Sequence, residues 1–108
     1  MLTLRGTHPN FGLYPNLPNP FNPITTISYS IATESQVTLS IYNVLGEKIR
    51  TLESATKQKG TYSAVWNSRD DRGSPVSAGI YIYRIEANPT SGEDQKPFID
   101  SKKMLLTK

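Results

Sequence analysis

The chain has 108 residues, a length that fits one domain, and its formal net charge is +3 at pH 7. It contains no cysteine, which excludes a disulfide scaffold and any chemistry that needs a thiolate. The 12 basic and 9 acidic residues are scattered, so we expect a solvated surface rather than a nucleic-acid interface. No stretch is apolar for long enough to cross a membrane, and the N-terminus lacks a signal-peptide core. We therefore expect a piece of a longer protein that does not insert into a membrane.

The first part of the chain predicts irregular structure. Residues 1–12 contain glycine, proline and asparagine, and we expect a linker or terminal segment there, followed by one domain over 13–108. His8 is the only histidine of the chain, so a loop position is the better prediction for it than a metal site.

A proline-rich segment follows at residues 13–23, with the sequence LYPNLPNPFNP. Proline lacks an amide donor, so four prolines in this run exclude a central strand of a sheet. We expect an extended segment at the edge of the fold, attached to the core by Leu17 and Phe21.

The rest of the chain shows the two-residue alternation of apolar and polar residues that is typical of strands with one buried face. No amphipathic helix pattern appears, so the sequence predicts an all-β fold, an antiparallel sandwich of short strands. The single tryptophan, Trp66, is expected to anchor the core, because it offers the largest apolar area per residue. In the strand at 79–87, Ile80 and Ile82 lie on one face and Tyr81 lies on the other. Large apolar side chains on both faces predict a strand that is covered on both sides. The alternation predicts strands at 25–31, 37–42, 47–52, 61–67, 79–87 and 97–106, and it places Ile27, Tyr29, Val37, Leu39, Ile41, Trp66 and Ile85 in one core.

The turn between the second and third of these strands has a specific predicted geometry. The sequence Asn43-Val44-Leu45-Gly46 fits a type I turn followed by a left-handed residue, a conformation that glycine tolerates because it has no Cβ. We therefore predict a positive φ at Gly46. Val44 and Leu45 are unusually apolar for a turn, and we expect them to fold over the open end of the core.

Few residues have a pattern that supports catalysis or metal binding. The segment NSRDDRG at 67–73 is acidic and turn-rich, but Asp70 and Asp71 are adjacent rather than alternating, so we expect an Asx-type turn and no calcium site. No nucleophile is grouped with a histidine and an acid, and no glycine-rich phosphate loop follows a strand, so we expect no catalytic residues and no cofactor. Candidates for a sugar-stacking platform are Tyr42, Tyr62, Tyr81 and Tyr83, although alternation places most of them in the core.

Five segments of the chain form a recognisable series: LPNPFNPITTISYSI, IYNVLGEKIRTL, GTYSAVWNSRDDRG, SAGIYIYRIEA and KMLLTK. In this order they resemble the C-terminal sorting domain of the type IX secretion system. The same pattern is similar to the Ig-like module of flagellar hook-capping proteins. The resemblance covers residues 13–108, with two departures: Leu17 stands where the family often has tyrosine, and the loop at 88–100 is longer than usual.

The resemblance implies an Ig-like antiparallel sandwich of about seven strands without catalytic activity. It implies that the domain directs a larger cargo protein, which precedes it in the chain, through the outer membrane by the type IX translocon. It also implies a sortase-like peptidase as a partner, which removes the domain so that the cargo is released or joined to a surface lipopolysaccharide. The expected location is therefore secreted or at the cell surface.

The resemblance places the recognition signal in two segments, at 79–84 and at 103–108. Met104, Leu105 and Leu106 cannot all face inward from one strand, so at least one of them is available to a partner. The lysines that flank them are typical of a free sheet edge, to which a receptor can add a strand of its own. The residues implied in translocon recognition are Gly79, Tyr81, Tyr83, Arg84, Lys103, Met104, Leu105, Leu106 and Lys108.

An alternative interpretation stays open from the sequence: an accessory Ig-like module that binds carbohydrate or protein within a secreted enzyme. Exposed coplanar aromatic side chains would favour the carbohydrate-binding module. A position at the end of the parent protein would favour the sorting domain, and KMLLTK ends this chain.

Overall fold

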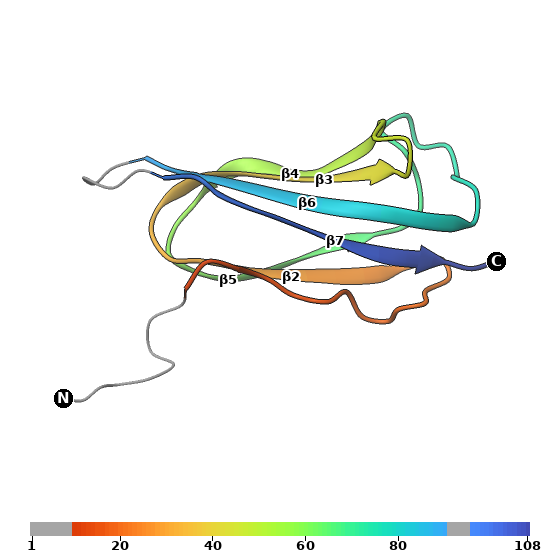
Figure 1. Ribbon diagram of the computed structural model, residues 1–108, viewed down its shortest axis with the longest axis horizontal. Helices are drawn as coiled ribbons and strands as arrows, with labels where there is room; N and C mark the ends of the chain where they lie inside the picture. The colour runs from red at the N-terminus through yellow and green to blue at the C-terminus, as the bar shows by residue number, and fades with distance from the viewer. Residues whose placement is uncertain (1–9, 91–95) are drawn as a thin grey trace.

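The computed structural model describes residues 10–90 and 96–108, and it confirms the predicted all-β antiparallel sandwich (Figure 1). No helix in this described part of the chain is long and apolar enough to span a bilayer. The strands are β1 (Gly12–Leu13), β2 (Thr25–Ile31), β3 (Ser35–Asn43), β4 (Lys48–Lys57), β5 (Gly60–Trp66), β6 (Gly79–Pro89) and β7 (Phe98–Leu106).

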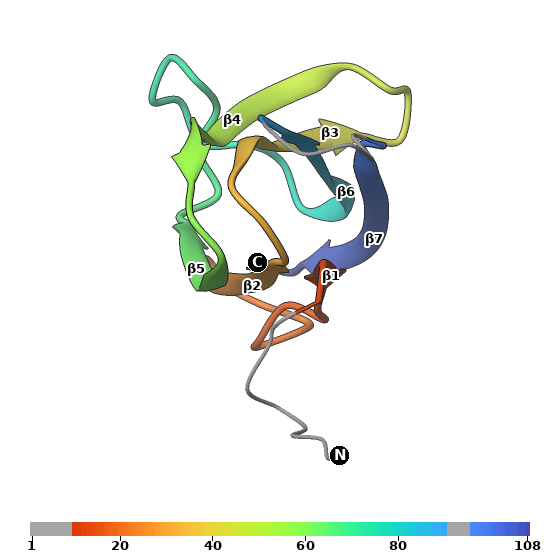
Figure 2. The ribbon, with the colours of Figure 1, turned by 90° about the vertical axis from the view of Figure 1, so that its left-hand side faces the viewer.

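The strands form two sheets that face each other, as the end-on view in Figure 2 shows. The larger sheet has the order β4-β3-β6-β7, and the smaller one has the order β1-β2-β5. All neighbouring strands are antiparallel. Strand β6 lies between β3 and β7, so β7 is an edge strand of the larger sheet.

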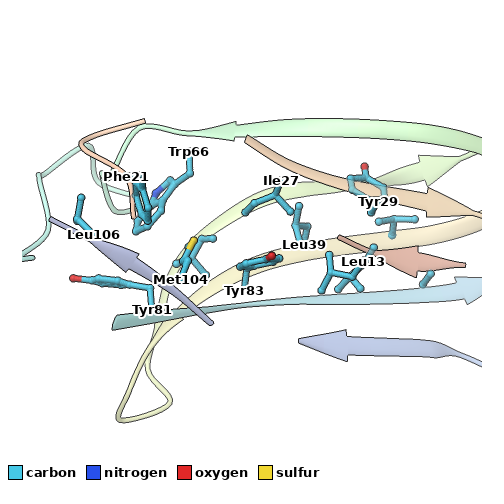
Figure 3. Packing of buried hydrophobic residues seen from close by; sticks show 14 of the residues in the cluster. Leu13, Phe21, Ile27, Tyr29, Leu39, Trp66, Tyr81, Tyr83, Met104 and Leu106 are labelled. Carbon is cyan, nitrogen blue, oxygen red and sulfur yellow. The ribbon is translucent and has the colours of Figure 1, made fainter. Parts of the chain in front are cut away.

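The predicted core is confirmed in full. Ile27, Tyr29, Val37, Leu39, Ile41, Trp66 and Ile85 all have 0% of their surface exposed. Trp66 is the largest fully buried side chain, and its indole Nε1 donates a hydrogen bond to the Arg69 carbonyl at 2.9 Å. It contacts Phe21, with ring centroids 5.8 Å apart, and Tyr81, with centroids 5.3 Å apart (Figure 3).

Strand β4 is longer than the predicted strand at 47–52, because it continues to Lys57 as the pairing partner of β3. Two register shifts interrupt this pairing, opposite Leu39/Ser40 and opposite Ile41/Tyr42. At these shifts Leu52 and Ile49 have no paired residue in β3, and both of these side chains pack against the core. Because the two residues are three positions apart, a regular strand would direct them to opposite faces, and the bulges remove that conflict.

The turn at 43–46 has the predicted backbone geometry, but its two apolar side chains do not cover the core as predicted. Gly46 has a φ of 84°, and its amide donates to the Asn43 carbonyl at 3.0 Å. Val44 is 65% exposed and Leu45 is 80% exposed, so the prediction that they cover the core is wrong. The Asn43 side-chain oxygen accepts hydrogen bonds from the Leu45 and Glu47 amides at 3.0 Å, which closes the turn locally without any core contact.

The proline-rich segment is held by Phe21 rather than by both predicted anchors. Phe21 is 2% exposed, whereas Leu17 is 72% exposed, and the prediction for Leu17 is wrong. The backbone of Leu17 pairs with Thr26 on the outer edge of β2, which leaves its side chain in solvent.

Residues just before the predicted domain boundary at 12/13 also contact the sandwich. Phe11 stacks on Phe98, with ring centroids 5.3 Å apart, and Gly12, the first residue of β1, pairs with Ser30 of β2. The prediction of a loop position for His8 concerns a residue outside the described ones, and so do residues 91–95 of the loop predicted at 88–100. The described part of that loop is shorter than predicted, because β6 continues to Pro89 and β7 begins at Phe98.

We predict that Trp66→Ala lowers the free energy of unfolding by about 3–5 kcal/mol, because it leaves a cavity where both sheets meet. Chemical denaturation measures the loss. The adjacent Val65 is 58% exposed, so Val65→Ala is the matched control and should cost less than about 1 kcal/mol. Equal losses for the two variants would contradict the assignment of Trp66 as the anchor of the core.

We predict that Gly46→Val destabilises the domain by roughly 1–2 kcal/mol through its left-handed backbone. A Cβ at this position would meet nothing within 4 Å, so steric contact with neighbours does not contribute. Gly46→Asn should cost less, because asparagine tolerates this conformation better than a β-branched residue. Thermal unfolding of the two variants measures the difference in stability. A valine variant as stable as the asparagine variant would argue against backbone strain at this position.

Candidate functional site

The two segments that carry the predicted recognition residues lie side by side in the larger sheet. In the register of β6 and β7, Gly79 faces Leu106, Tyr81 faces Met104 and Ile82 faces Lys103. The structure therefore brings together two segments, at 79–84 and 103–108, that are distant in the chain, and it places them at one end of the larger sheet (Figure 1).

Four of the predicted residues belong to the core. Tyr81 is 7% exposed and Tyr83 0%, while Met104 and Leu106 are 2% and 1% exposed. The Tyr83 hydroxyl donates to the Tyr14 carbonyl at 2.7 Å, and the Tyr81 hydroxyl donates to the Ser77 carbonyl at 2.6 Å. Burial raises the pKa of both phenols, because the charged form would lose its hydration. In the folded domain these four side chains stabilise the sandwich and are not accessible to a partner.

The other predicted side chains are accessible. Leu105 is 39% exposed, which confirms that one of the three apolar residues near the end of the chain faces outward. Lys103 is exposed beside it on the outer face of β7. The Arg84 guanidinium lies 3.5 Å from the Glu86 carboxylate, and Lys108 Nζ donates a hydrogen bond to the Val76 carbonyl. The outer face of β7 therefore presents two of the predicted recognition residues, Leu105 and Lys103, to solvent.

Sequence analysis missed one accessible residue, Ile80. It is 45% exposed and stands directly opposite Leu105, so the prediction of a strand covered on both faces is wrong at this position. A shallow hollow of about 200 Å³ lies here, lined by Asn19, Ile80, Lys103, Met104 and Leu105. The alternation of Ile80 with Tyr81 was the available signal, because a buried Tyr81 requires an outward Ile80.

The edge of β7 is not free at its C-terminal end, contrary to the sequence-based expectation. The Leu105 amide donates to the Asn19 side-chain oxygen at 3.0 Å, and the Leu105 carbonyl accepts from the Phe21 amide at 3.0 Å. The Thr107 amide donates to the Phe21 carbonyl at 2.9 Å. The proline-rich segment thus occupies the hydrogen-bonding positions that a receptor strand would need.

The acidic segment at 67–73 forms the predicted Asx-type turn. Asp70 Oδ1 accepts hydrogen bonds from the Arg72 amide at 3.0 Å and from the Ser74 amide at 2.9 Å. Asp71 Oδ1 accepts from the Thr51 amide at 3.1 Å. The described residues contain no group of three or more metal-ligating side chains. These two carboxylates therefore shape the loop and tie it to β4.

The candidate tyrosines do not form a flat exposed platform. Tyr81 and Tyr83 are buried. Tyr62 stacks on the buried Tyr29, with ring centroids 5.6 Å apart, and Lys57 Nζ lies 5.0 Å from the Tyr62 ring centroid. Tyr42 is half-buried on the outer face of β3. This arrangement gives little support to carbohydrate stacking.

The sequence profile of the FlgD Ig-like domain matches residues 24–92, which is more than half of the chain. The chain belongs to this family. The match supports the Ig-like assignment of the sandwich and includes β2 to β6, whereas the proline-rich segment and β7 lie outside it. Comparison with curated protein sequences finds no match.

Solved structures of other proteins share the fold, and they include PorU, FlgD and PorZ. Dimeric latent PorU from Porphyromonas gingivalis has a TM-score of 0.71 and 20% identity, covering 95% of this chain and 10% of PorU. FlgD from P. aeruginosa has a TM-score of 0.58 and 15% identity, covering 78% and 67% of the two chains. PorZ, an essential bacterial surface component of the type-IX secretion system of P. gingivalis, has a TM-score of 0.52 and 21% identity, covering 90% and 12%. At such identities the likeness establishes the fold alone, and this chain spans only 10% of the PorU chain.

We predict that Leu106→Ala and Leu105→Ala differ sharply in stability although the two residues are neighbours. Leu106 is 1% exposed, so its truncation should cost about 2–5 kcal/mol, whereas Leu105 is 39% exposed and should cost less than about 1 kcal/mol. Urea denaturation of both variants gives the comparison. A larger loss for Leu105 would mean that the register of β7 is shifted by one residue.

Proposed function

We propose that this domain is a non-catalytic sorting module of the type IX secretion system. It directs a larger cargo protein through the outer membrane, for release or for attachment at the cell surface. Its partners are the type IX translocon, which recognises the outer face of β7, and a sortase-like peptidase, which removes the domain from its cargo. The upstream cargo domain supplies whatever activity the parent protein has.

The observation that carries this proposal is the division of the β7 side chains between core and surface. Met104 and Leu106 are buried, while Lys103 and Leu105 point outward beside Ile80. A short linear signal is thereby held in a fixed geometry on a rigid strand, with a cation and two apolar side chains facing the solvent. Such a patch suits recognition by a protein partner better than it suits catalysis, which needs converging polar groups.

The family match supports an Ig-like module without choosing its role, and the structural neighbours support the link to type IX secretion. The Ig-like domain family includes the FlgD module, and the neighbours include a surface component of the type IX system. A flagellar role is less favoured, because the five sequence segments that resemble sorting domains extend into the proline-rich segment and β7, outside the FlgD match.

The experiment fuses the whole chain to a periplasmic reporter in a host that has the type IX system. Deleting residues 103–108 would be ambiguous, because it also removes the core residues Met104 and Leu106. Substitutions of exposed side chains separate recognition from folding.

We predict that Leu105→Ser and Lys103→Glu each reduce the secreted reporter by about tenfold or more, while the melting temperature changes by no more than about 4 °C. The matched control is Ile99→Ser, because Ile99 is 48% exposed in the same strand and lies outside the terminal signal. Normal secretion of both signal variants, or failure of the unmodified fusion to leave the cell, would contradict the proposed function.

A further inference from the structure

The end of β7 is hydrogen-bonded on both of its edges. The backbone N–H and C=O groups of successive strand residues point to opposite edges of the strand. Those of Met104 and Leu106 therefore point to β6. Leu105 and Thr107 direct theirs to Asn19 and Phe21, which run parallel to β7 at this point. Residues 18–23, which we call the cover segment, therefore act as a short fifth strand of the larger sheet.

The cover segment is attached to β7 by few bonds. Pro18, Pro20 and Pro23 have no amide to donate, and the backbone of Phe21 makes the segment's only backbone hydrogen bonds to β7 among the described residues. Phe21 is also the only buried side chain between positions 18 and 23, where it packs on Trp66 (Figure 3). Among the described residues the segment is hydrogen-bonded to β7 only through Asn19 and Phe21, while Thr25 Oγ1 and Ser68 Oγ donate to its Pro18 and Pro23 carbonyls away from β7. Separation of the segment from β7 therefore breaks few hydrogen bonds and leaves the pairing of β6 with β7 intact.

A strand without prolines would make more bonds at the same edge. By alternation, the backbone of Lys103 points to the same side as that of Leu105. Within the described residues the cover segment makes no backbone hydrogen bond with Lys103. A continuous partner strand would bond with Lys103, Leu105 and Thr107 in succession, and a carboxylate on it would meet the exposed Lys103 ammonium.

We propose that the edge of β7 from Lys103 to Thr107 is a strand-docking site that the cover segment occupies within the free domain. The partner is an extended, proline-poor peptide strand with an acidic residue opposite Lys103. It replaces the cover segment and places an apolar or aromatic side chain where Phe21 packs on Trp66. The inference rests on the proposed function, because the partner strand belongs to the export machinery, and it adds that recognition requires exchange of one strand for another.

The first test measures whether the cover segment opens independently. In the full chain, amide hydrogen exchange of Leu105 and Thr107 should be about tenfold or more faster than that of Met104 and Leu106, after correction for intrinsic rates. Asn19→Ala should speed exchange of the Leu105 amide further, whereas Asn19→Asp, which keeps an acceptor, should not. Equal protection of all four amides would overturn the proposal, because the cover would then leave only when β7 itself unfolds.

The second test locks the cover in place. Asn22 and Thr107 are exposed and lie one position beyond the paired Phe21 and Leu106, so Asn22→Cys with Thr107→Cys can form a disulfide across the edge. Secretion of a reporter fused to the oxidised double variant should fall by about tenfold or more relative to the same double variant with its disulfide reduced, while the single variant Asn22→Cys is secreted like the unmodified domain.

A control disulfide distinguishes the lock from a general effect of cross-linking. Thr26 and Val65 are direct partners in β2 and β5 of the smaller sheet, which does not contain β7, so Thr26→Cys with Val65→Cys should leave secretion unchanged. Normal secretion of the locked Asn22/Thr107 variant would overturn strand exchange and leave the sorting function intact. Failure of the unmodified fusion to be secreted would instead contradict the sorting function itself.

Discussion

The packing of Trp66 against Tyr81 is the contact on which the rest of the structure depends, and Phe21 covers this pair from the proline-rich segment. Trp66 ends β5 in the smaller sheet, Tyr81 belongs to β6 in the larger sheet, and Phe21 comes from the proline-rich segment along the edge of β7. One aromatic cluster therefore joins the two sheets and fixes the path of the chain that leads into them. Aromatic side chains suit this position, because each buries a large apolar area and offset or edge-on rings add a further attraction.

This contact also positions the candidate site. Because Phe21 is held against Trp66, its backbone lies beside β7, where it pairs with Leu106. The same strand that contributes Met104 and Leu106 to the core contributes Leu105 and Lys103 to the surface. Folding and the proposed recognition thus draw on alternate residues of one strand, so a substitution at an inward position tests stability and a substitution at an outward position tests the proposed recognition.

The fold by itself does not separate the functions that the relatives suggest. PorU, PorZ and FlgD all contain a domain of this shape, at identities of 15–21% with this chain. A sandwich tolerates many surfaces as long as its inward residues keep their alternation, so the function must be argued from the outer faces and edges. In this chain the distinguishing features are the cover segment and β7, which lie outside the FlgD match and contact each other.

The sequence alone determined the sandwich, its core and the turn at Gly46, because two-residue alternation and the demand for a left-handed glycine are local properties. It also determined that one of Met104, Leu105 and Leu106 must face outward. Only the tertiary structure decided that Leu17 is exposed while Phe21 is buried, and that Val44 and Leu45 stand clear of the core. It alone brought Ile80 beside Leu105 and the proline-rich segment onto the edge of β7. Pairing between segments distant in the chain depends on which edges remain open after the sheets have formed, and no local pattern records that.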